Sequence, residues 1–341
     1  MRMNIKEFDY SLPKASIAQY PEKDREASRM LVLNRADGSI AHRSFRDITH
    51  YLQDGDVLVL NDSKVVPARI RAKKITGGAI DILLVEKIND NRWFCLVNGV
   101  KGGTGDLKVI IGSTEATLSK GEEYWIIDFA HNDNMIDIMA EYGNMPLPPY
   151  VKRKDNDGVI DFDRYQTVYA EMPGSIAAPT AGFHFTNELL ASIRQVGVYI
   201  AKITLHIGVG TFFLIKSQDV QDHRMHGEYY HITPETKEFI RKAKEDGRRI
   251  IACGTSVVRT LESLYNGNGG VPLAGKTELF IYPGHRFKIV DALITNFHLP
   301  RSTPLLLVSA FAGPDKIMRC YTEAMERGYR FYSYGDAMFI Q

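Results

Sequence analysis

The sequence predicts an α/β domain with a mixed sheet flanked by helices, accompanied by a small antiparallel β-barrel or sandwich. From about Asp161 onward, helical segments alternate with compact apolar strands, and this spacing is typical of βαβ units. From about Pro67 to Tyr150, short strands follow one another without helices, which is typical of a small barrel or sandwich. The chain has 341 residues, more than one hydrophobic core usually holds, so about two domains are expected.

Each expected strand is a short apolar run, and each expected helix has an apolar face. Near the N-terminus we expect strands at 27–34 and 54–62, and in the α/β part we expect strands at 198–205, 248–254, 277–282 and 290–297 and helices at 186–197 and 234–247. In the barrel part, β-branched and aromatic residues indicate strands at 68–75, 79–88, 92–99, 107–112 and 122–129, with turn sequences such as TGG and KGGTGD between them. The pattern leaves open which part the first two strands join.

Composition and charge exclude several classes of protein. The 42 basic and 41 acidic residues give a net charge of +1, so only local patches such as ARIRAKK and VKRKDNDG are candidates for RNA contacts. No apolar run approaches the ~20 residues that span a bilayer, and the N-terminus lacks an apolar signal core. Cys95, Cys253 and Cys320 are far apart, which argues against disulfides and favours a cytoplasmic location.

The most unusual stretch is PGSIAAPTAGFHFTNELL, residues 173–190. It carries Thr180, Gly182 and His184 ahead of a helix whose expected N-cap is Thr186. In open α/β sheets, ligands bind where strands end and helices begin. The density of glycine, proline and small residues therefore favours close approach by a bound ligand, although a rigid turn with a buried histidine would look similar.

A second junction is ACGTSVVRTLES. A strand is expected to end at Cys253 and a helix to begin at Thr255 or Ser256. Arg259 and Glu262 are three residues apart and therefore share a helix face. Such a pair fits a surface contact as well as it fits a substrate contact.

The third junction, NFHLPRSTP, is the strongest site that the pattern alone predicts. One loop holds His298, Arg301 and Ser302. An apolar helix follows, with Thr303 as its expected N-cap and Pro304 at its first position. An imidazole, a guanidinium and hydroxyl groups are thus expected near one helix N-terminus.

A fourth stretch, LHIGVGTFFLI followed by HRMHGEYYHI, argues against two common kinds of site. Gly208 and Gly210 have no third glycine in the dinucleotide-binding spacing, and no Walker A sequence is present. The histidines lack the H-E-x-x-H spacing and a nearby cysteine, so a metal site is not expected. We expect His226 and Glu228 instead in a mobile loop over a pocket.

At these stretches the sequence resembles the S-adenosylmethionine:tRNA ribosyltransferase-isomerases of queuosine biosynthesis. The resemblance covers essentially the whole chain and rests on PGSIAAPTAGFHF, LHIGVGTF, MHGEYY, ACGTSVVRTLES, TELFIYPG, LITNFHLPRSTPLLLVSAFAG and YRFYSYGDAMFI, in this order. It implies a discontinuous α/β catalytic domain of residues 1–61 and 155–341, with a β-barrel domain inserted at 62–154. It also implies that the ribosyl part of S-adenosylmethionine moves onto an aminomethyl-deazaguanine at the tRNA wobble position and rearranges, giving epoxyqueuosine, adenine and methionine.

The implied reaction sets demands on the pocket. A base must take a proton beside the sulfonium, a donor helps adenine to leave, and a cation suits the methionine carboxylate, whereas no metal is expected. We nominate four catalytic residues, with the two histidines as acid/base groups: His184, His298, Glu262 and Asp336. The expected substrate-binding residues are Thr180, Gly182, Thr255, Ser256, Arg259, Glu278, Asn296, Arg301 and Ser302. Arg259 and Arg301 are the candidates for carboxylate or phosphate contacts.

The implied partner is tRNA, whose target base must be splayed out to reach a pocket. Lys152, Arg153 and Lys154 are the expected phosphate contacts, and the protein is expected to be a monomer. Two alternatives stay open: an RNA-binding adapter without a small-molecule pocket, and a transferase that acts on free nucleosides. A common Rossmann-type methyltransferase is not indicated, because the glycine-rich turn after its first strand is missing.

Overall fold

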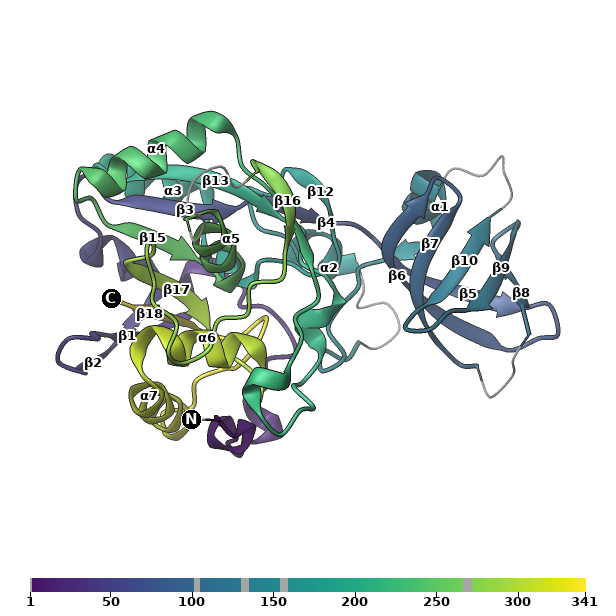
Figure 1. The fold of residues 1–341 in the computed structure, drawn as a ribbon, viewed down its shortest axis with the longest axis horizontal. Coiled ribbons are helices and arrows are strands. Elements are labelled where there is room, and N and C mark those ends of the chain that lie inside the picture. Colours follow the sequence, from purple (N-terminus) through teal and green to yellow (C-terminus); the bar gives the residue numbers. More distant parts are fainter. Residues whose placement is uncertain (1, 101–104, 130–134, 154–158, 266–271) are drawn as a thin grey trace. The chain divides into compact units, whose positions relative to one another are not determined.

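The computed structural model describes residues 2–100, 105–129, 135–153, 159–265 and 272–341, which divide into two compact units (Figure 1). The α/β unit comprises Met1–Lys64, Pro149–Lys152 and Arg164–Gln341, and the barrel unit comprises Val65–Pro148 and Arg153–Asp163. Both ends of the chain thus build the α/β unit, and the predicted fold class is confirmed. The main difference from the predicted domain ranges lies where the chain leaves the barrel for the α/β unit, because Arg153–Asp163 groups with the barrel.

Nine of the described strands form one mixed sheet in the order β16-β14-β13-β3-β15-β17-β18-β1-β2. Their bounds are β1 Arg29–Leu33, β2 Ile40–Ser44, β3 Val57–Asn61, β13 Tyr199–Leu205, β14 Glu228–His231, β15 Ile250–Cys253, β16 Ala274–Thr277, β17 Ala292–Asn296 and β18 Ala337–Ile340. Four neighbours, β13, β3, β15 and β17, are mutually parallel. The expected strands at 27–34 and 54–62 correspond to β1 and β3, both labelled in Figure 1, and the strand order places both in this sheet.

Helices cover both faces of the sheet, which explains why its central strands are apolar throughout. Side chains alternate along β3, so that Val57 and Val59 pack on one face and Leu58 and Leu60 on the other. The first face is covered by α4 (Pro234–Glu245), α5 (Thr255–Tyr265), α6 (Thr303–Ala312) and α7 (Pro314–Glu326). The second is covered by α3 (Asn187–Gln195) and the 3₁₀ helix Phe45–Tyr51.

The barrel unit closes on itself, because β5 pairs with both β6 and β8. The strands are β5 Arg69–Lys74, β6 Ala79–Asn89, β7 Arg92–Asn98, β8 Leu107–Ile111, β9 Thr114–Lys120 and β10 Trp125–Phe129, with β11 Gly143–Asn144 added to β5. The remaining elements are α1 Met135–Tyr142, α2 Val159–Arg164 and the pair β4 Ser63–Val65 and β12 Met172–Ser175. Closure leaves the barrel without long exposed strand edges.

Three local expectations need comment. Thr186 is the N-cap of α3, as predicted, and its hydroxyl accepts the Leu189 amide at 3.0 Å. The predicted cap of α6 was wrong by one residue, because Ser302 caps that helix and Thr303 is its first residue. The predicted strand at 277–282 was wrong beyond Thr277, where β16 ends. None of the described helices has both the length and the apolar character needed to span a membrane.

Candidate active site

A cavity lies at the carboxyl edge of the four parallel strands, where ligands bind in open α/β sheets. Loops after β13, β15 and β17 form its walls, together with the small-residue stretch that precedes α3. The cavity brings together the following predicted residues: Thr180, Thr255, Ser256, Arg259, Asn296, His298 and Ser302. The predicted residues outside its lining are His184, Gly182, Glu262, Glu278, Arg301 and Asp336.

Small residues form one wall of the cavity, so the backbone of this wall lies close to the cavity. Ala177, Ala178 and Ala181 line it beside Pro179, as the density of small residues in this stretch suggested. Beside Ala181, β15 turns into α5 at Gly254, whose φ of +94° strains any residue with a side chain. The first turn of α5 therefore borders the cavity and presents the hydroxyl side chains of Thr255 and Ser256.

His298 faces the cavity from the loop between β17 and α6. Its Nε2 lies 2.8 Å from the Thr295 hydroxyl, and its backbone amide donates to the Tyr321 hydroxyl at 2.9 Å. Burial lowers the pKa of His298 to about 3, so the imidazole is neutral near pH 7. A neutral imidazole can hydrogen-bond a substrate without prior loss of a proton.

His184 lies behind the cavity wall and is only 4 % exposed. Its Nε2 is 3.1 Å from Asn296 Nδ2, and its Nδ1 is 2.6 Å from Ser28 Oγ. Burial, followed by repulsion from Arg25 and Arg330, lowers the pKa of His184 to about 3. Both ring nitrogens are engaged within the protein, so this placement supports positioning of Asn296 rather than direct contact with a substrate.

Arg259 lines the cavity, but its guanidinium is bonded to other groups of the protein. It forms an ion pair with Glu228, and it donates to the carbonyl oxygens of Leu279 at 3.0 Å and Thr277 at 3.1 Å. Glu228 lies in β14, not in a mobile loop as expected, and also accepts the Gly208 amide at 3.0 Å. Arg259 therefore ties the edge strand β16 and its neighbour β14 to α5, and these contacts favour a structural role over the predicted contact with a substrate carboxylate.

Glu262 is fully buried on α5, away from the cavity lining. Its position on the helix suggested a pair with Arg259, but the two side chains do not pair. Instead its carboxylate accepts the backbone amides of Lys288, Ile289 and Val290 at 3.0–3.2 Å. This arrangement favours a structural role over the nominated catalytic one.

A matched pair of variants separates these two roles. Glu262→Gln turns an amide NH₂ toward backbone donors, which is expected to lower the free energy of unfolding by about 1–3 kcal/mol. Turnover per folded molecule should stay near that of the parent, measured after correction for the folded fraction by denaturant titration. Glu326→Gln, at an exposed position on α7, is the control and should change neither quantity. A loss of turnover at full stability in Glu262→Gln would restore the catalytic role.

The other predicted residues outside the lining are held by local contacts. Asp336 is buried, and its two oxygens accept the amides of Arg29 and Arg330 at 2.8 Å each. Arg301 pairs with Asp9 at 3.4 Å and has left-handed backbone with φ of +53°. A Cβ at Gly182 would lie 2.0 Å from the Tyr169 hydroxyl, so packing accounts for this glycine.

Sequence reasoning missed the aromatic part of the cavity. The rings that line it are Tyr150, Tyr165, Phe212, Phe280, Phe297 and Tyr332. Tyr332 is a second residue with left-handed backbone, φ +72°, and such strain gathers at functional sites. The tyrosine-rich YRFYSYG segment was the signal that could have identified it.

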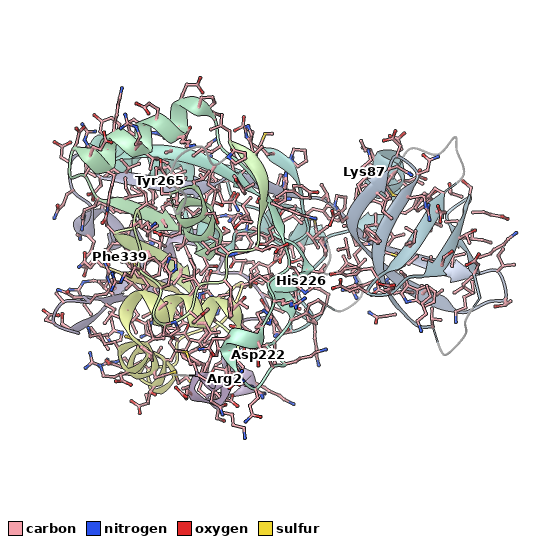
Figure 2. The ribbon with its side chains drawn as sticks, in the orientation of Figure 1. Arg2, Lys87, Asp222, His226, Tyr265 and Phe339 are labelled. Carbon is pink, nitrogen blue, oxygen red and sulfur yellow. The ribbon has the colours of Figure 1, made fainter. Side chains whose placement is uncertain are left out.

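His223 and His226 line another part of the cavity, near the segment that leads into β14; His226 is labelled in Figure 2. Burial lowers the pKa of His223, and His226 lowers it further. Within the described ranges, no group of three or more His, Cys, Asp or Glu side chains is arranged to hold a metal ion.

The three predicted RNA contacts have different surroundings. Lys152 is exposed, and its amide donates to Gln19 Oε1 at 2.9 Å. Arg153 makes a two-pronged ion pair with buried Asp161 at 2.7 and 2.8 Å, which ties up its guanidinium. Lys154 lies outside the described residues.

Comparisons with known proteins identify the family of the chain. The family model described as "Queuosine biosynthesis protein" matches residues 5–340. Relatives named S-adenosylmethionine:tRNA ribosyltransferase-isomerase include those of Thermotoga petrophila, 49% identical, and Pelobacter propionicus, 48% identical, each matched over 99% of this chain and 100% of the relative. The crystal structure of S-adenosylmethionine tRNA ribosyltransferase from Thermotoga maritima is 39% identical, covers 98% of this chain and 100% of its own, and has a TM-score of 0.56. The chain therefore belongs to the queuosine biosynthesis family of S-adenosylmethionine:tRNA ribosyltransferase-isomerases and is an enzyme of tRNA modification.

Proposed function

We propose that the enzyme transfers the ribosyl moiety of S-adenosylmethionine to 7-aminomethyl-7-deazaguanine at the tRNA wobble position and isomerises it, with release of adenine and methionine. The product is tRNA that carries epoxyqueuosine. The observation that carries the proposal is the cavity at the carboxyl edge of the parallel strands, lined by small and aromatic residues in a chain that matches this family from end to end. Aromatic faces suit both purine rings and a sulfonium cation.

His298 is the acid/base candidate that the geometry supports best, because it faces the cavity and is neutral. We propose that it hydrogen-bonds the reacting nucleoside. His298→Gln keeps a polar side chain but cannot exchange a proton, so adenine release is expected to fall by about 10²- to 10⁴-fold, the usual contribution of a general acid or base. Chromatographic assay of released adenine measures it. Turnover within a few-fold of the parent would exclude this role.

The methionine carboxylate needs a positive environment, and neither nominated arginine supplies it. Arg259 is engaged by Glu228, and Arg301 by Asp9. The N-terminus of α5 borders the cavity, and helix N-termini carry a partial positive charge with unpaired amides. We therefore propose that the carboxylate lies against the first turn of α5, near Thr255. Thr255→Pro, which removes an amide, should weaken S-adenosylmethionine binding more than Thr255→Ala, as isothermal titration would show; equal effects would remove this assignment.

Position-specific labels test the reaction itself. Precursor-bearing tRNA is incubated with S-adenosylmethionine labelled in the ribose or, separately, in the methyl group. Ribose label should enter the tRNA, whereas methyl label should stay with the released methionine. Methyl label in the RNA would indicate a methyltransferase. Ribose transfer to the free nucleoside at a rate that equals transfer to tRNA would favour the alternative of a nucleoside transferase.

Lys152, which is exposed, is the described member of the predicted cluster 152–154 that we test as a phosphate contact. Lys152→Glu is expected to weaken tRNA binding and to reduce the dependence of log K on log salt by roughly one unit, as loss of one phosphate contact does. Filter binding at several salt concentrations measures it. Lys242→Glu on α4 is a control of equal charge change. An equal decrease in both variants would mean a general charge effect.

Two further properties complete the proposal. Because its substrate is tRNA, we expect the enzyme to act in the cytoplasm. We also expect a monomer, since both walls of the cavity come from one chain. Analytical ultracentrifugation at assay concentrations checks this, and a stable dimer would contradict it.

A further inference from the structure

A continuous series of hydrogen bonds connects the 3₁₀ helix Arg25–Ala27 with the cavity wall. Ser28 Oγ is 3.0 Å from the Arg25 carbonyl oxygen and 2.6 Å from His184 Nδ1. His184 Nε2 is 3.1 Å from Asn296 Nδ2, and Asn296 Oδ1 is 2.9 Å from Thr180 Oγ1. Thr180 and Asn296 both line the cavity, whereas Ser28 and His184 do not.

The carbonyl oxygen of Arg25, at one end of the series, fixes which group donates in each of its hydrogen bonds. A carbonyl oxygen only accepts, so Ser28 donates to Arg25 and must accept from His184 Nδ1. A neutral imidazole that donates through Nδ1 accepts at Nε2, and an amide nitrogen is the donor it faces. Asn296 Oδ1 is then free to accept the Thr180 hydroxyl proton. The reverse order would leave the Ser28–Arg25 contact without a proton.

This order determines what the cavity wall offers a ligand. The only proton on the Thr180 hydroxyl is committed to Asn296, so Thr180 Oγ1 can act toward a ligand only as an acceptor. Asn296 Nδ2 has a second proton beyond the one given to His184 and is therefore a donor. An acceptor and a donor thus stand side by side on one wall.

Aromatic side chains line the same cavity as this pair. Phe297, which follows Asn296, accepts the Tyr332 amide through its carbonyl at 3.1 Å. The Tyr332 ring contacts the Tyr150 ring at a centroid distance of 4.8 Å, and the Tyr150 hydroxyl is 2.7 Å from Ser333 Oγ. A backbone hydrogen bond and a ring contact thus hold Tyr332 in its left-handed conformation, and Tyr332 lines the cavity. Together, these groups suit a planar base with a donor beside an acceptor on its edge.

We propose that Thr180 and Asn296 recognise the adenine edge of S-adenosylmethionine and that His184 is the positioning residue that fixes their donor and acceptor roles. The exocyclic amino group donates to Thr180 Oγ1, and the neighbouring ring nitrogen accepts from Asn296 Nδ2. This bond to the ring nitrogen also draws electron density from the base as it leaves. The inference rests on the proposed function, which makes S-adenosylmethionine the ligand of this cavity.

Binding of two ligands to three proteins tests the recognition. In hypoxanthine an acceptor oxygen replaces the amino group and N1 carries a proton, so the parent should bind S-adenosylmethionine at least about 10-fold more tightly than S-inosylmethionine. Thr180→Val removes the acceptor and should weaken S-adenosylmethionine binding by about 5- to 20-fold. It should leave S-inosylmethionine within about 2-fold of the parent, since that ligand never used the acceptor. Thr180→Ser retains the hydroxyl and should keep the discrimination.

Each other outcome overturns the assignment. Equal weakening of both ligands by Thr180→Val would mean a merely structural effect, and thermal denaturation identifies a misfolded variant. Weakened binding of free 7-aminomethyl-7-deazaguanine with unchanged S-adenosylmethionine would assign the pair to the other base. Because isothermal titration needs no turnover, failure here is distinct from failure of ribosyl transfer.

The role of His184 has its own spectroscopic test. Nitrogen-15 chemical shifts of histidine-labelled protein should show one neutral imidazole protonated at Nδ1, and this signal should be absent from His184→Gln. Gln can offer an oxygen near the position of Nε2, so His184→Gln should keep the base discrimination, whereas the shorter side chain of His184→Asn should lose it. An Nε2-protonated His184, or equal discrimination in both variants, would overturn the positioning role.

Discussion

Replacing Arg259 with alanine is expected to lower the free energy of unfolding by about 3–5 kcal/mol, which would make it among the most destabilising single changes in the α/β unit. The side chains of Arg259 and Glu228 are each 9% exposed, so the variant leaves a buried carboxylate without its counter-charge. It also frees the carbonyl oxygens of Thr277 and Leu279, which Arg259 now satisfies. Urea titration with global fitting measures the effect.

Two further variants show where the effect comes from. Adding Glu228→Gln to Arg259→Ala removes the buried charge and should restore part of the lost stability, although the Gly208 amide keeps a weaker acceptor. Arg2→Ala breaks the exposed pair between Arg2 and Asp219 (Arg2 is labelled in Figure 2) and should change stability little, because exposed pairs contribute little. If Arg259→Ala resembled Arg2→Ala, the buried pair would not be the structural tie that its contacts indicate.

The same contacts explain an error in the prediction from sequence. The apolar run TELFIY was expected to be a strand, but β16 ends at Thr277. Local periodicity identifies an extended apolar segment, but it cannot show whether a neighbouring strand will pair with it. Here the carbonyl oxygens at 277 and 279 accept from Arg259 on α5, so a side chain takes the place of a ladder there.

The location of the cavity could be predicted because it depends on a general rule. Strand–helix alternation predicted parallel strands, and the carboxyl ends of parallel strands meet at one edge, so residues as distant as Thr180, Ser256 and His298 were expected together. Their order in the sheet was not needed for this inference. The aromatic lining was missed because Tyr150 and Tyr332 come from loops, whose conformation periodicity does not specify.

Individual roles were harder to predict than the location. His184, Glu262 and Asp336 are chemically suitable and lie in the distinctive motifs, but each is satisfied by groups far away in sequence, such as Ser28 for His184 and the 288–290 amides for Glu262. A carboxylate that accepts backbone amides and one that faces a substrate look alike in a sequence. Only the tertiary partners distinguish them, and residue type alone does not reveal those partners.

The stability of the protein is expected to fall as the pH is lowered from 6.5 to 5, and His184 should account for about 2 kcal/mol of this decrease. Its folded-state pKa of about 3 lies below the ordinary value of 6.5, so in this range the unfolded chain binds a proton that the folded protein does not. Protons therefore favour unfolding, by about 1.4 kcal/mol per pH unit. Above pH 6.5 both states are neutral and the effect vanishes.

Comparison with His184→Gln isolates this contribution from that of other titrating groups. His298 acts in the same direction, whereas burial raises the pKa of Asp62 and Asp336, which therefore act in the opposite direction. These groups are common to both proteins, so the difference between the two curves of unfolding free energy against pH should be flat above pH 6.5 and should change by about 2 kcal/mol by pH 5. Parallel curves would mean that His184 has the same pKa in the folded and unfolded states and takes up its proton as readily when folded. The acceptance by Nε2 from Asn296, and with it the acceptor role of Thr180, would then lose its support, because a buried imidazole that accepts from an amide resists protonation.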